Sequence, residues 1–464
     1  MSEPIKDIGT KGKLRWKHRS PVKKEPIPAP ARRAAIAAFV GSFIEFYDYS
    51  IFHILLVYFS PLFFPGNDPS VTLLAGMAVY GVGFIGRPLG GIVFGRIGDL
   101  RGRRAALMMT IGLMGLCTAL IGLLPGYAAI GLAAPVLLVI LRFGQGLSAG
   151  SEILGSVTLV IETAPPSRRA FLASMTPLGV ASGGLFGSAV AVAASSMFSP
   201  AEMSAYGWRI AFLLVVPLTL IAFLLRRRVE DSPEFKELAR SHHTVKSPLL
   251  EAIGSNWKTM ILACGVAVTA YGPASASTFY IPYLVGTREL PFAAVTIANS
   301  IASAFALLAP PLAGVMTDRL GHRSMLALVF GAFFVLAFPM MWLVGATESA
   351  ALMGVVLTVH LALNQLIAVP AWSYIAMLFP ANVRYTGSTL AANVGAVLVG
   401  SSGGLAAAAL IFATGSPMGA TIWISGWSLA GLAVLALSSG YARRLKNSSG
   451  AMPYRFSDSN SGSH

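Results

Sequence analysis

Charge and cysteine are both scarce in this chain, and each shortage excludes a class of protein. Charged residues make up 11% of its 464 residues, whereas soluble domains carry about 25%. The two cysteines, Cys117 and Cys264, lie in separate apolar stretches, so neither a disulfide framework nor a cysteine metal site is expected. The sequence contains no metal-binding, nucleotide-binding or nucleophile motif and no long polar domain. We therefore expect neither an enzyme, nor a cofactor, nor a metal centre.

Long hydrophobic runs are what the chain has in abundance. Hydrophobic residues make up 55% of it, and its mean hydropathy is +0.70. A run of about 20 apolar residues is long enough to cross the hydrocarbon core of a bilayer. Twelve such stretches occur, at approximately Ala34–Ser60, Val71–Phe94, Ala105–Leu124, Ala133–Ile161, Ala170–Phe198, Gly207–Leu225, Thr259–Gly286, Phe292–Thr317, Ser324–Gly345, Ala350–Phe379, Tyr385–Ala413 and Gly419–Tyr441. The sequence thus predicts an all-α membrane protein with twelve transmembrane helices.

The basic residues are distributed unevenly along these stretches. Of 34 Lys and Arg, 30 lie in the tails and in the loops that follow even-numbered stretches. Arg87 and Arg142 lie inside stretches, which leaves Arg209 and Arg288 for the other side. Because positive charge is retained on the cytoplasmic side, both termini are predicted to be cytoplasmic. Topology and anionic lipid then explain the net charge of +15, and nucleic-acid binding is not needed.

Polar segments divide the chain into two halves of six stretches each. The tails are too polar to build a core, so we expect them to be disordered. Within the central loop, the amphipathic piece Pro233–Arg240 predicts a short helix at the membrane surface. The predicted parts are a basic tail (1–33), a first six-helix bundle (34–225), a cytoplasmic central loop (226–258), a second six-helix bundle (259–441) and a second cytoplasmic tail (442–464).

A short polar motif occurs at the same place in both halves. Gly-Arg-Ile-Gly-Asp-Leu-Arg-Gly-Arg-Arg, from Gly95 to Arg104, follows the second stretch, and Gly-Val-Met-Thr-Asp-Arg-Leu-Gly-His-Arg, from Gly314 to Arg323, follows the eighth. Asp99 aligns with Asp318 at the offset that aligns the other shared positions. Such a repeat indicates duplication, and two duplicated bundles that rock about a site between them are the plan of many secondary transporters.

The motif also predicts a latch between the bundles. Gly95 and Gly98 allow helix ends to approach closely, and Gly102 suits a tight turn. Asp99 can accept hydrogen bonds from a helix N-terminus or from a neighbouring arginine. The basic residues of the motif are expected to contact other helix ends and lipid phosphate. The predicted latch residues are Gly95, Asp99, Arg103, Arg104, Asp318 and Arg323.

Ionisable residues inside the predicted membrane helices are costly and are candidates for function. Glu45 and Asp48 lie three residues apart and hence on one face of the first helix. Glu45 is about 16 Å in from Ala34 at 1.5 Å per residue, and Arg142 lies at a similar depth in the fourth helix. Arg87, in the second helix, lies closer to the cytoplasmic end. These acids and bases can hold a proton or substrate, or can form static salt bridges that fix helix packing.

Three further polar residues leave two interpretations open. Glu152, ten residues beyond Arg142, belongs either to the site or to the gate, where it could pair with the loop motif. His360 and Asn364 lie one turn apart in the tenth helix, and His360 is either a proton carrier or a packing residue. Glu162, at the end of the fourth helix, is expected to form a solvated salt bridge with the nearby arginines.

Several motifs together resemble the metabolite:proton symporter family of the major facilitator superfamily. Phe43-Ile44-Glu45-Phe46-Tyr47-Asp48-Tyr49 is similar to the family's first-helix motif, and Arg87-Pro88-Leu89-Gly90-Gly91 leads into the loop motif as in the family. The fourth helix, the central loop and the segment Phe379–Gly387 also match. One departure is Ser151-Glu152-Ile153-Leu154, where many members read Gly-Glu-Tyr-Thr, so two hydroxyl groups are missing from an expected cavity wall.

The resemblance implies a monomeric carrier in the inner membrane of a bacterium, which imports a small polar metabolite together with protons. A proton-antiporting exporter on the same fold and a non-transporting membrane sensor are the alternatives. Because a midplane guanidinium is costly unless it has an anionic partner, the substrate is predicted to carry a carboxylate. Arg142 is its first candidate ligand and Arg87 its second. In the competing account, Glu45 or Asp48 occupies Arg142, and neutral groups hold the substrate.

Overall fold

The computed structural model describes residues 25–66, 69–241, 247–347 and 349–448, and within these ranges the chain forms helices and loops but no β-strand. Twelve helical spans among the described residues are long and apolar enough to cross a membrane. The prediction of twelve transmembrane helices is thereby confirmed, with bounds that differ from the sequence prediction by a few residues.

The first six spans and the last six form two separate bundles. In the first bundle the elements are α1 (Ala29–Phe63), α2 (Pro69–Arg101), α3 (Arg103–Leu123), α4 (Tyr127–Ile130), α5 (Ala133–Thr163), η1 (Pro166–Arg168), α6 (Arg169–Ala173), α7 (Met175–Met197), α8 (Pro200–Glu202), η2 (Met203–Gly207), α9 (Trp208–Leu213) and α10 (Val215–Arg227). The second contains α13 (Trp257–Ser275), η3 (Ala276–Phe279), α14 (Tyr280–Gly286), α15 (Phe292–Ala306), α16 (Ala309–Leu320), α17 (His322–Ala346), α18 (Ala350–Leu378), α19 (Arg384–Gly395), η4 (Ala396–Gly400), α20 (Gly403–Thr414) and α21 (Gly419–Ser448). Between the bundles, the central loop carries α11 (Pro233–Arg240) and α12 (Pro248–Ile253).

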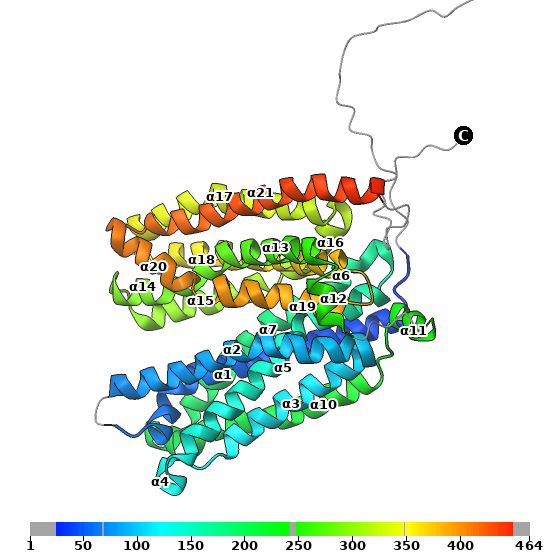
Figure 1. Cartoon of the computed structure of the whole chain (residues 1–464). Coiled ribbons are helices and arrows are strands. Elements are labelled where there is room, and N and C mark those ends of the chain that lie inside the picture. Colours follow the sequence, from blue (N-terminus) through cyan, green and yellow to red (C-terminus); the bar gives the residue numbers. More distant parts are fainter. Residues whose placement is uncertain (1–24, 67–68, 242–246, 348, 449–464) are drawn as a thin grey trace, which may run out of the picture.

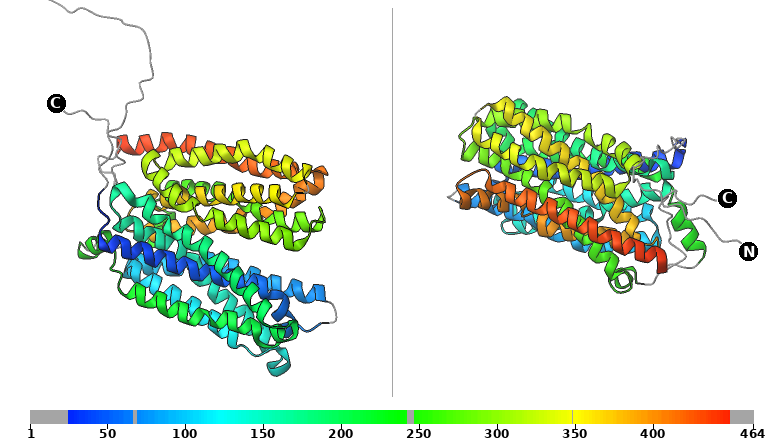
Figure 2. Two further views of the ribbon diagram at one scale, coloured as in Figure 1. Left: turned by 180° about the vertical axis from the view of Figure 1, so that it is seen from behind. Right: turned by 90° about the horizontal axis from the view of Figure 1, so that it is seen from above.

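The two bundles lie side by side as two layers, the second above the first in Figure 1. The start of α1, the end of α21 and the helix α11 lie at one end of the molecule, and α4 and α14 lie at the other (Figures 1 and 2). We call these the terminal end and the opposite end. Hydrogen bonds between the bundles cluster at the terminal end, where α2 and α5 meet α19.

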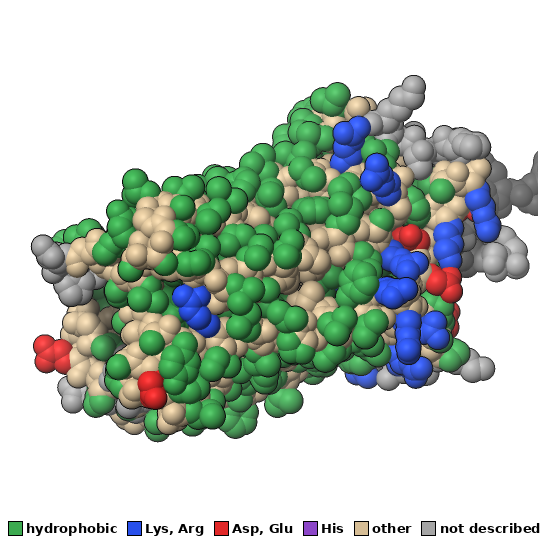
Figure 3. Space-filling model, turned by 90° about the horizontal axis from the view of Figure 1, so that it is seen from below, with side chains coloured by type: hydrophobic (Ala, Val, Ile, Leu, Met, Phe, Trp, Pro, Cys, Tyr) green, Lys and Arg blue, Asp and Glu red, His purple; other side chains and the backbone are tan. Residues whose placement is uncertain are grey.

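The outer surface is that of a membrane protein. Hydrophobic side chains cover most of the face shown in Figure 3, and Lys and Arg gather at the terminal end. Large apolar side chains on this surface are highly exposed, as Phe412 is at 91% and Leu437 at 78%. Exposed apolar surface on this scale would be unfavourable in water, and it fits a lipid environment.

Glycines bring α2 and α5 into close contact and thereby position Arg87. A β-carbon on Gly150 of α5 would lie 2.0 Å from the backbone oxygen of Arg87, and one on Gly146 would lie 2.0 Å from that of Gly83. Any side chain at these positions would force the helices apart. The close approach places Arg87 beside the seam between the bundles.

The ends of the predicted segments differ in three places. Residues 29–33, assigned to the first tail, belong to α1, and α21 continues to Ser448 through part of the second tail. Residues 1–24 and 449–464 of the tails lie outside the described residues. The central loop holds α12 in addition to the expected helix Pro233–Arg240. Arg226, assigned to the loop, is a buried residue in the last turn of α10.

Candidate functional site

Glu45 of α1 and Arg87 of α2 form an ion pair beside the seam between the bundles. Arg87 Nη2 donates to Glu45 Oε1 at 2.5 Å, and the two side chains are 8% and 2% exposed. Glu45 Oε2 is buried without a hydrogen-bond partner among the described residues. Arg87 also lines a small pocket between the bundles, which Tyr271 and Asn393 line from the second bundle. Arg87 is the cation among the residues that line this pocket, so a ligand in the seam would meet its guanidinium.

Asp48 and Arg142 form a second pair, deeper inside the first bundle. Arg142 Nη1 donates to Asp48 Oδ2 at 3.1 Å, and neither side chain is exposed. Asp48 Oδ1 also accepts from Thr118 Oγ1 at 2.7 Å and from Gln145 Nε2 at 2.6 Å. Asp48 is thus held by three donors on three side chains.

Three aromatic rings pack against the Arg142 guanidinium, whose Nε and Nη2 are buried without a hydrogen-bond partner among the described residues. Its central carbon lies 4.8, 4.2 and 4.9 Å from the ring centres of Tyr49, Phe52 and Tyr80. Such cation–π contacts compensate a desolvated guanidinium. The geometry therefore favours the account in which Asp48 occupies Arg142, and it favours Arg87 over Arg142 as the cation open to a ligand.

Glu152 of α5 does not pair with the loop motif, which corrects one of the two interpretations left open. Its carboxylate instead binds Arg226 of α10, through two hydrogen bonds from the guanidinium. Thr110 Oγ1 donates to the same carboxylate at 2.9 Å, and Ser156 Oγ donates at 3.2 Å. Sequence reasoning missed Arg226, because its neighbours Arg227 and Arg228 made it look like one of a run of loop residues.

His360 and Asn364 lie apart from these ion pairs, in the second bundle. His360 of α18 is fully buried, and its Nδ1 lies 3.1 Å from the hydroxyl of Tyr280 at the start of α14. Its ring also packs against Phe333 of α17. Asn364 is half-buried one turn further along α18. These contacts are of the kind that the packing interpretation expects, whereas His360 Nε2 is buried without a hydrogen-bond partner among the described residues. None of the contacts brings His360 to Glu45 or Arg87, and both interpretations of it stay predictions.

The Asp99 copy of the loop motif holds the bundles together at the terminal end. Asp99 Oδ1 and Oδ2 accept from the backbone N–H groups of Tyr385 at 3.2 Å and Thr386 at 2.9 Å. These amides belong to the first turn of α19, whose N-terminus favours negative charge. A β-carbon on Gly95 would lie 3.0 Å from Thr386 Cα, and one on Gly98 would lie 2.7 Å from the Tyr385 ring. The structure therefore places Asp99 at a helix N-terminus of the other bundle.

The Asp318 copy makes the same contact in the reverse direction. Asp318 of α16, in the second bundle, accepts from the backbone N–H groups of Ala170 at 2.9 Å and Phe171 at 3.0 Å in α6 of the first bundle. Gly314 is the counterpart of Gly95, and its β-carbon would lie 2.6 Å from Phe171 Cα. Two aspartates thus join the bundles across a pseudo-twofold relation.

Arg103 extends the Asp99 contact into a buried ion network. Its guanidinium lies 3.2 Å from Asp99 Oδ1 and binds both carboxylate oxygens of Glu162, at 3.0 and 3.1 Å. Arg384, at the start of α19, donates to Glu162 at 2.8 Å and also binds Glu234 of α11. Glu162 is 5% exposed, so the solvated salt bridge expected for it is wrong. It bridges the two bundles because the end of α5 is packed against α19.

The last motif residue of each copy stays within its own half of the molecule. The backbone N–H of Arg104 donates to Asp231 Oδ1 at 2.8 Å, and Arg104 Nη2 donates to the carbonyl of Arg227 at 2.9 Å. Arg323 Nη2 donates to the carbonyl of Leu435 in α21 at 2.6 Å. Neither arginine joins the bundles through these contacts. Among the predicted latch residues, Asp99, Asp318 and Arg103 have side chains that bind groups of the other bundle.

Comparison with known proteins decides the family. The sequence profile of the Major Facilitator Superfamily matches residues 38–405. The chain belongs to this superfamily. Its similarity to a proline/betaine transporter of Escherichia coli K12 is 32% identity over 389 residues, which cover 81% of the chain and 77% of the relative. A shikimate transporter of the same strain is 32% identical over 392 residues, which cover 82% and 88%.

Solved structures of this superfamily show the same fold. The proton:xylose symporter XylE bound to 6-bromo-6-deoxy-D-glucose superposes with a TM-score of 0.70 at 16% identity, covering 89% of this chain and 96% of that one. The resemblance stated from the sequence motifs is therefore confirmed, as is the fold of two pseudo-symmetric six-helix bundles. The protein is a secondary transporter of the membrane and not an enzyme.

Proposed function

We propose that the protein imports a small carboxylate or zwitterionic metabolite together with protons, by alternating access between its bundles. The observation that carries the proposal is the Glu45–Arg87 ion pair beside the pocket at the seam. Its relatives include transporters named for proline and betaine and for shikimate. These compounds carry a carboxylate, for which a buried arginine is a suitable partner.

The ion pair provides a route to couple the two cargoes. A substrate carboxylate that binds Arg87 replaces Glu45 as its anionic partner. Glu45 is then a buried carboxylate without a cation, a state that is unfavourable unless it takes up a proton. Proton and substrate are thus accepted together, and the net charge beside Arg87 is unchanged. When the proton leaves, Glu45 returns to Arg87 and displaces the substrate.

The orientation of the transporter is part of the proposal. Lys and Arg gather at the terminal end (Figure 3), and this distribution supports cytoplasmic termini in the inner membrane of a bacterium. The two aspartate latches would then close the cytoplasmic side in the state described here. We propose that one chain suffices for transport, since the pocket at the seam is formed between the two bundles of one chain.

Uptake into proteoliposomes tests the function directly. Labelled betaine, proline and shikimate, with xylose as a neutral solute, are offered with and without an imposed pH gradient. Accumulation driven by external acid supports symport. Efflux of preloaded substrate driven by the same external acid would favour the proton-antiporting exporter, and binding without any transport would favour the sensor.

Two arginine variants test the assignment of the substrate ligand. We expect Arg87→Lys to weaken equilibrium binding of the best carboxylate substrate about tenfold, since lysine keeps the charge but loses the planar fork. Arg142→Lys is expected to leave affinity within about twofold of the parent and to lower thermal stability, since it breaks the buried contact with Asp48. The opposite result, loss of affinity in Arg142→Lys alone, would return the carboxylate site to Arg142.

A further inference from the structure

The Glu152–Arg226 pair is buried in the first bundle and has no part in the substrate site described above. We propose that it is the station through which the proton leaves Glu45 toward the terminal end, by a route inside the first bundle and separate from the substrate path. The inference rests on the proposed proton coupling and adds the release route to it.

The near side of the route lies on one face of α1. Ser42 precedes Glu45 by three residues, so the two side chains lie on the same helical face. Ser42 Oγ and Glu45 Oε2 are both buried and lack a hydrogen-bond partner among the described residues. Buried polar atoms of this kind call for an explanation, and a shared proton or water is one that serves both. Glu45 also lies near enough to Glu152 for the two acids to interact electrostatically.

Gly41 removes the barrier between this face and the Glu152–Arg226 pair. A β-carbon on Gly41 would lie 1.8 Å from Arg226 Nη2 and 2.1 Å from Glu152 Oε1. The backbone of α1 therefore passes directly against the ion pair, one turn before Glu45. Gly41 and Ser42 lie four and three residues before Glu45, both within one turn of it, and in the proposed route the unpartnered hydroxyl of Ser42 connects the two acids.

Glu152 is the acid that the proposed route reaches after Glu45. Its donors come from α3, α5 and α10, in the form of Thr110, Ser156 and Arg226. The titratable or charged groups around it include Arg226, with which it is paired, and Glu45 and, from α19, Tyr385, on both of which its charge acts. Proton transfer from Glu45 to Glu152 leaves Glu45 as a carboxylate free to rejoin Arg87. Glu152 then returns to its ion pair when its proton passes to water.

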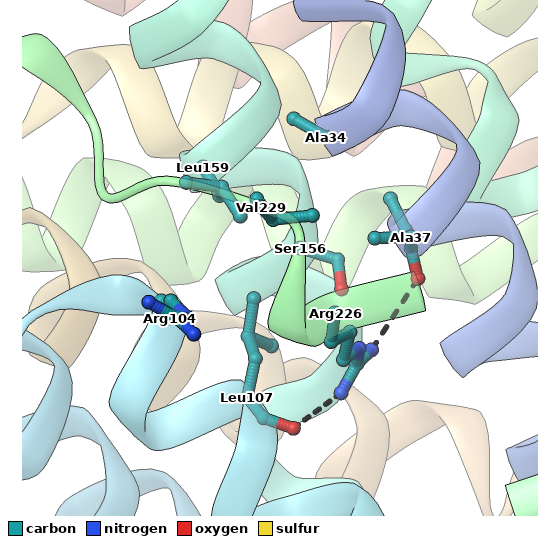
Figure 4. Close-up of a pocket in the computed structure, with 9 residues that line it drawn as sticks. Ala34, Ala37, Arg104, Leu107, Ser156, Leu159, Arg226 and Val229 are labelled. Atoms are coloured by element: carbon teal, nitrogen blue, oxygen red, sulfur yellow. Dashed lines mark hydrogen bonds between the residues drawn. The ribbon is translucent and has the colours of Figure 1, made fainter. Parts of the chain in front are cut away.

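The far side of the route is a pocket at the terminal end, shown in Figure 4. Arg226 and Ser156, which both bind Glu152, line this pocket together with Ala34, Ala37 and Leu107. In Figure 4 the Arg226 guanidinium lies between α1 and α3 and is hydrogen-bonded to the carbonyls of Ala37 and Leu107. The residues that line the pocket come from the first bundle and from the segment directly after α10. The outlet is therefore separate from the Asp99 and Asp318 contacts that close the seam.

Glu152→Gln tests the station in the full-length transporter in proteoliposomes. Counterflow exchanges labelled for unlabelled substrate without net proton movement, whereas uptake driven by a pH gradient requires proton release. We expect counterflow within about twofold of the parent and gradient-driven uptake reduced at least about tenfold. Glu202→Gln is the matched control, because Glu202 is an exposed glutamate of the same bundle bonded to Ser199; both of its activities should match the parent.

Ser42→Ala decides the case in which Glu152→Gln damages folding and both activities fall together. This variant leaves the Glu152–Arg226 pair intact, and we expect a severalfold loss of gradient-driven uptake with counterflow retained. The proposal is overturned if Glu152→Gln keeps gradient-driven uptake, or if it loses both activities while Ser42→Ala behaves as the parent. If the parent itself shows no gradient-driven uptake, the proposed symport fails, and the release route fails with it.

Discussion

The two aspartate contacts at the terminal end share their backbone geometry but differ in their charge. Asp99 and Asp318 each accept two amide hydrogen bonds from the first turn of a helix in the other bundle. Asp99 also contacts Arg103, whose network continues through Glu162 to Arg384. In the described part of the chain, Asp318 contacts no arginine directly, and Arg168 acts on it only electrostatically.

The sequence explains this difference. At the offset that aligns Asp99 with Asp318, His322 takes the place of Arg103. The capping amides of Tyr385 and Thr386 align with those of Ala170 and Phe171 at a slightly shorter offset, at which Met377 takes the place of Glu162. The second copy therefore lacks both the cation and the anion from which the first builds its network. Duplication has preserved the aspartate that caps a helix, which needs only backbone amides. The ion network of Arg103, Glu162 and Arg384, which needs several matched side chains, is built at the Asp99 contact.

Among the variants that test this difference, Asp99→Asn should change the population of the closed state most. The amide keeps one acceptor oxygen but loses the charge that binds two N–H groups and Arg103, and hydrogen bonds to charged groups contribute about 1.5–3 kcal/mol. We expect the closed state of the terminal end to lose population about tenfold or more. Transport should be impaired while abundance and substrate affinity stay near those of the parent. Spin-label distances between Arg101→Cys and Arg319→Cys would report the opening, with Cys117 and Cys264 replaced by alanine.

A large loss of substrate affinity in Asp99→Asn with unchanged turnover would contradict the latch and would point to a role in binding. Glu237→Gln is a suitable control in the same distance measurement. It removes an acid from the terminal end, on α11, without removing a contact between the bundles. Its distance distribution should match that of the parent.

Gly314→Ala should open the other contact by a steric route. Its β-carbon would lie 2.6 Å from Phe171 Cα and 2.9 Å from the carbonyl oxygen of Ala170, both backbone atoms. Overpacking of this kind costs about 1–3 kcal/mol, so we expect a severalfold shift toward the open state. Gly331→Ala is the matched control, because nothing lies within 4 Å of its β-carbon. Equal behaviour of the two variants would show that the α16–α6 contact does not limit opening.

Asp318→Asn is expected to shift the same distances less than Asp99→Asn, by about threefold, since no arginine loses its partner. If both aspartate variants open the terminal end equally, the network around Arg103 contributes nothing to closure. The capping amides alone would then account for both contacts. In that case the Asp99 and Asp318 contacts would differ in sequence but contribute equally to the free energy of closure.

The sequence predicted what local pattern determines. The twelve spans follow from apolar length, and the latch aspartates follow from a repeated motif at equivalent loops. The ion partners were harder to predict, because Glu162 binds Arg384 across 222 positions and Glu152 binds Arg226 across 74. Arg226 and Glu162 also lie in the last turns of their helices, where the sequence alone predicts that a charged side chain is exposed to solvent. Only the packing of α10 against α1 and α3, and of α5 against α19, shows that they are buried.

The smallest expected effect concerns Glu234, which joins the central loop to the Asp99 side through Arg384. Its side chain is 26% exposed, and burial raises its pKa above the ordinary value, although Arg384 acts in the opposite direction. When the terminal end is open and Glu234 is in water, the Glu234 carboxyl group would have an ordinary pKa, about 4.3. The closed state therefore binds the proton more tightly. Its relative stabilisation is complete below the ordinary pKa and is lost as pH rises through the raised one.

Acidification on that side should thus favour the closed state, even though it weakens the ion pair with Arg384. We expect the spin-label distances of the parent to shift modestly toward closure between pH 7 and pH 5, by less than about tenfold, since one pKa unit corresponds to 1.36 kcal/mol. Glu234→Gln should remove its share of this response. Glu230→Gln, in the same loop but exposed and paired with Lys236, should retain this pH response.

If Glu234→Gln keeps the full pH response, other acids at the terminal end produce it. If instead acid opens the parent and Glu234→Gln abolishes that opening, the attraction of Arg384 outweighs the burial of Glu234. The pair would then hold the Asp99 side closed in a way that the Asp318 side cannot match.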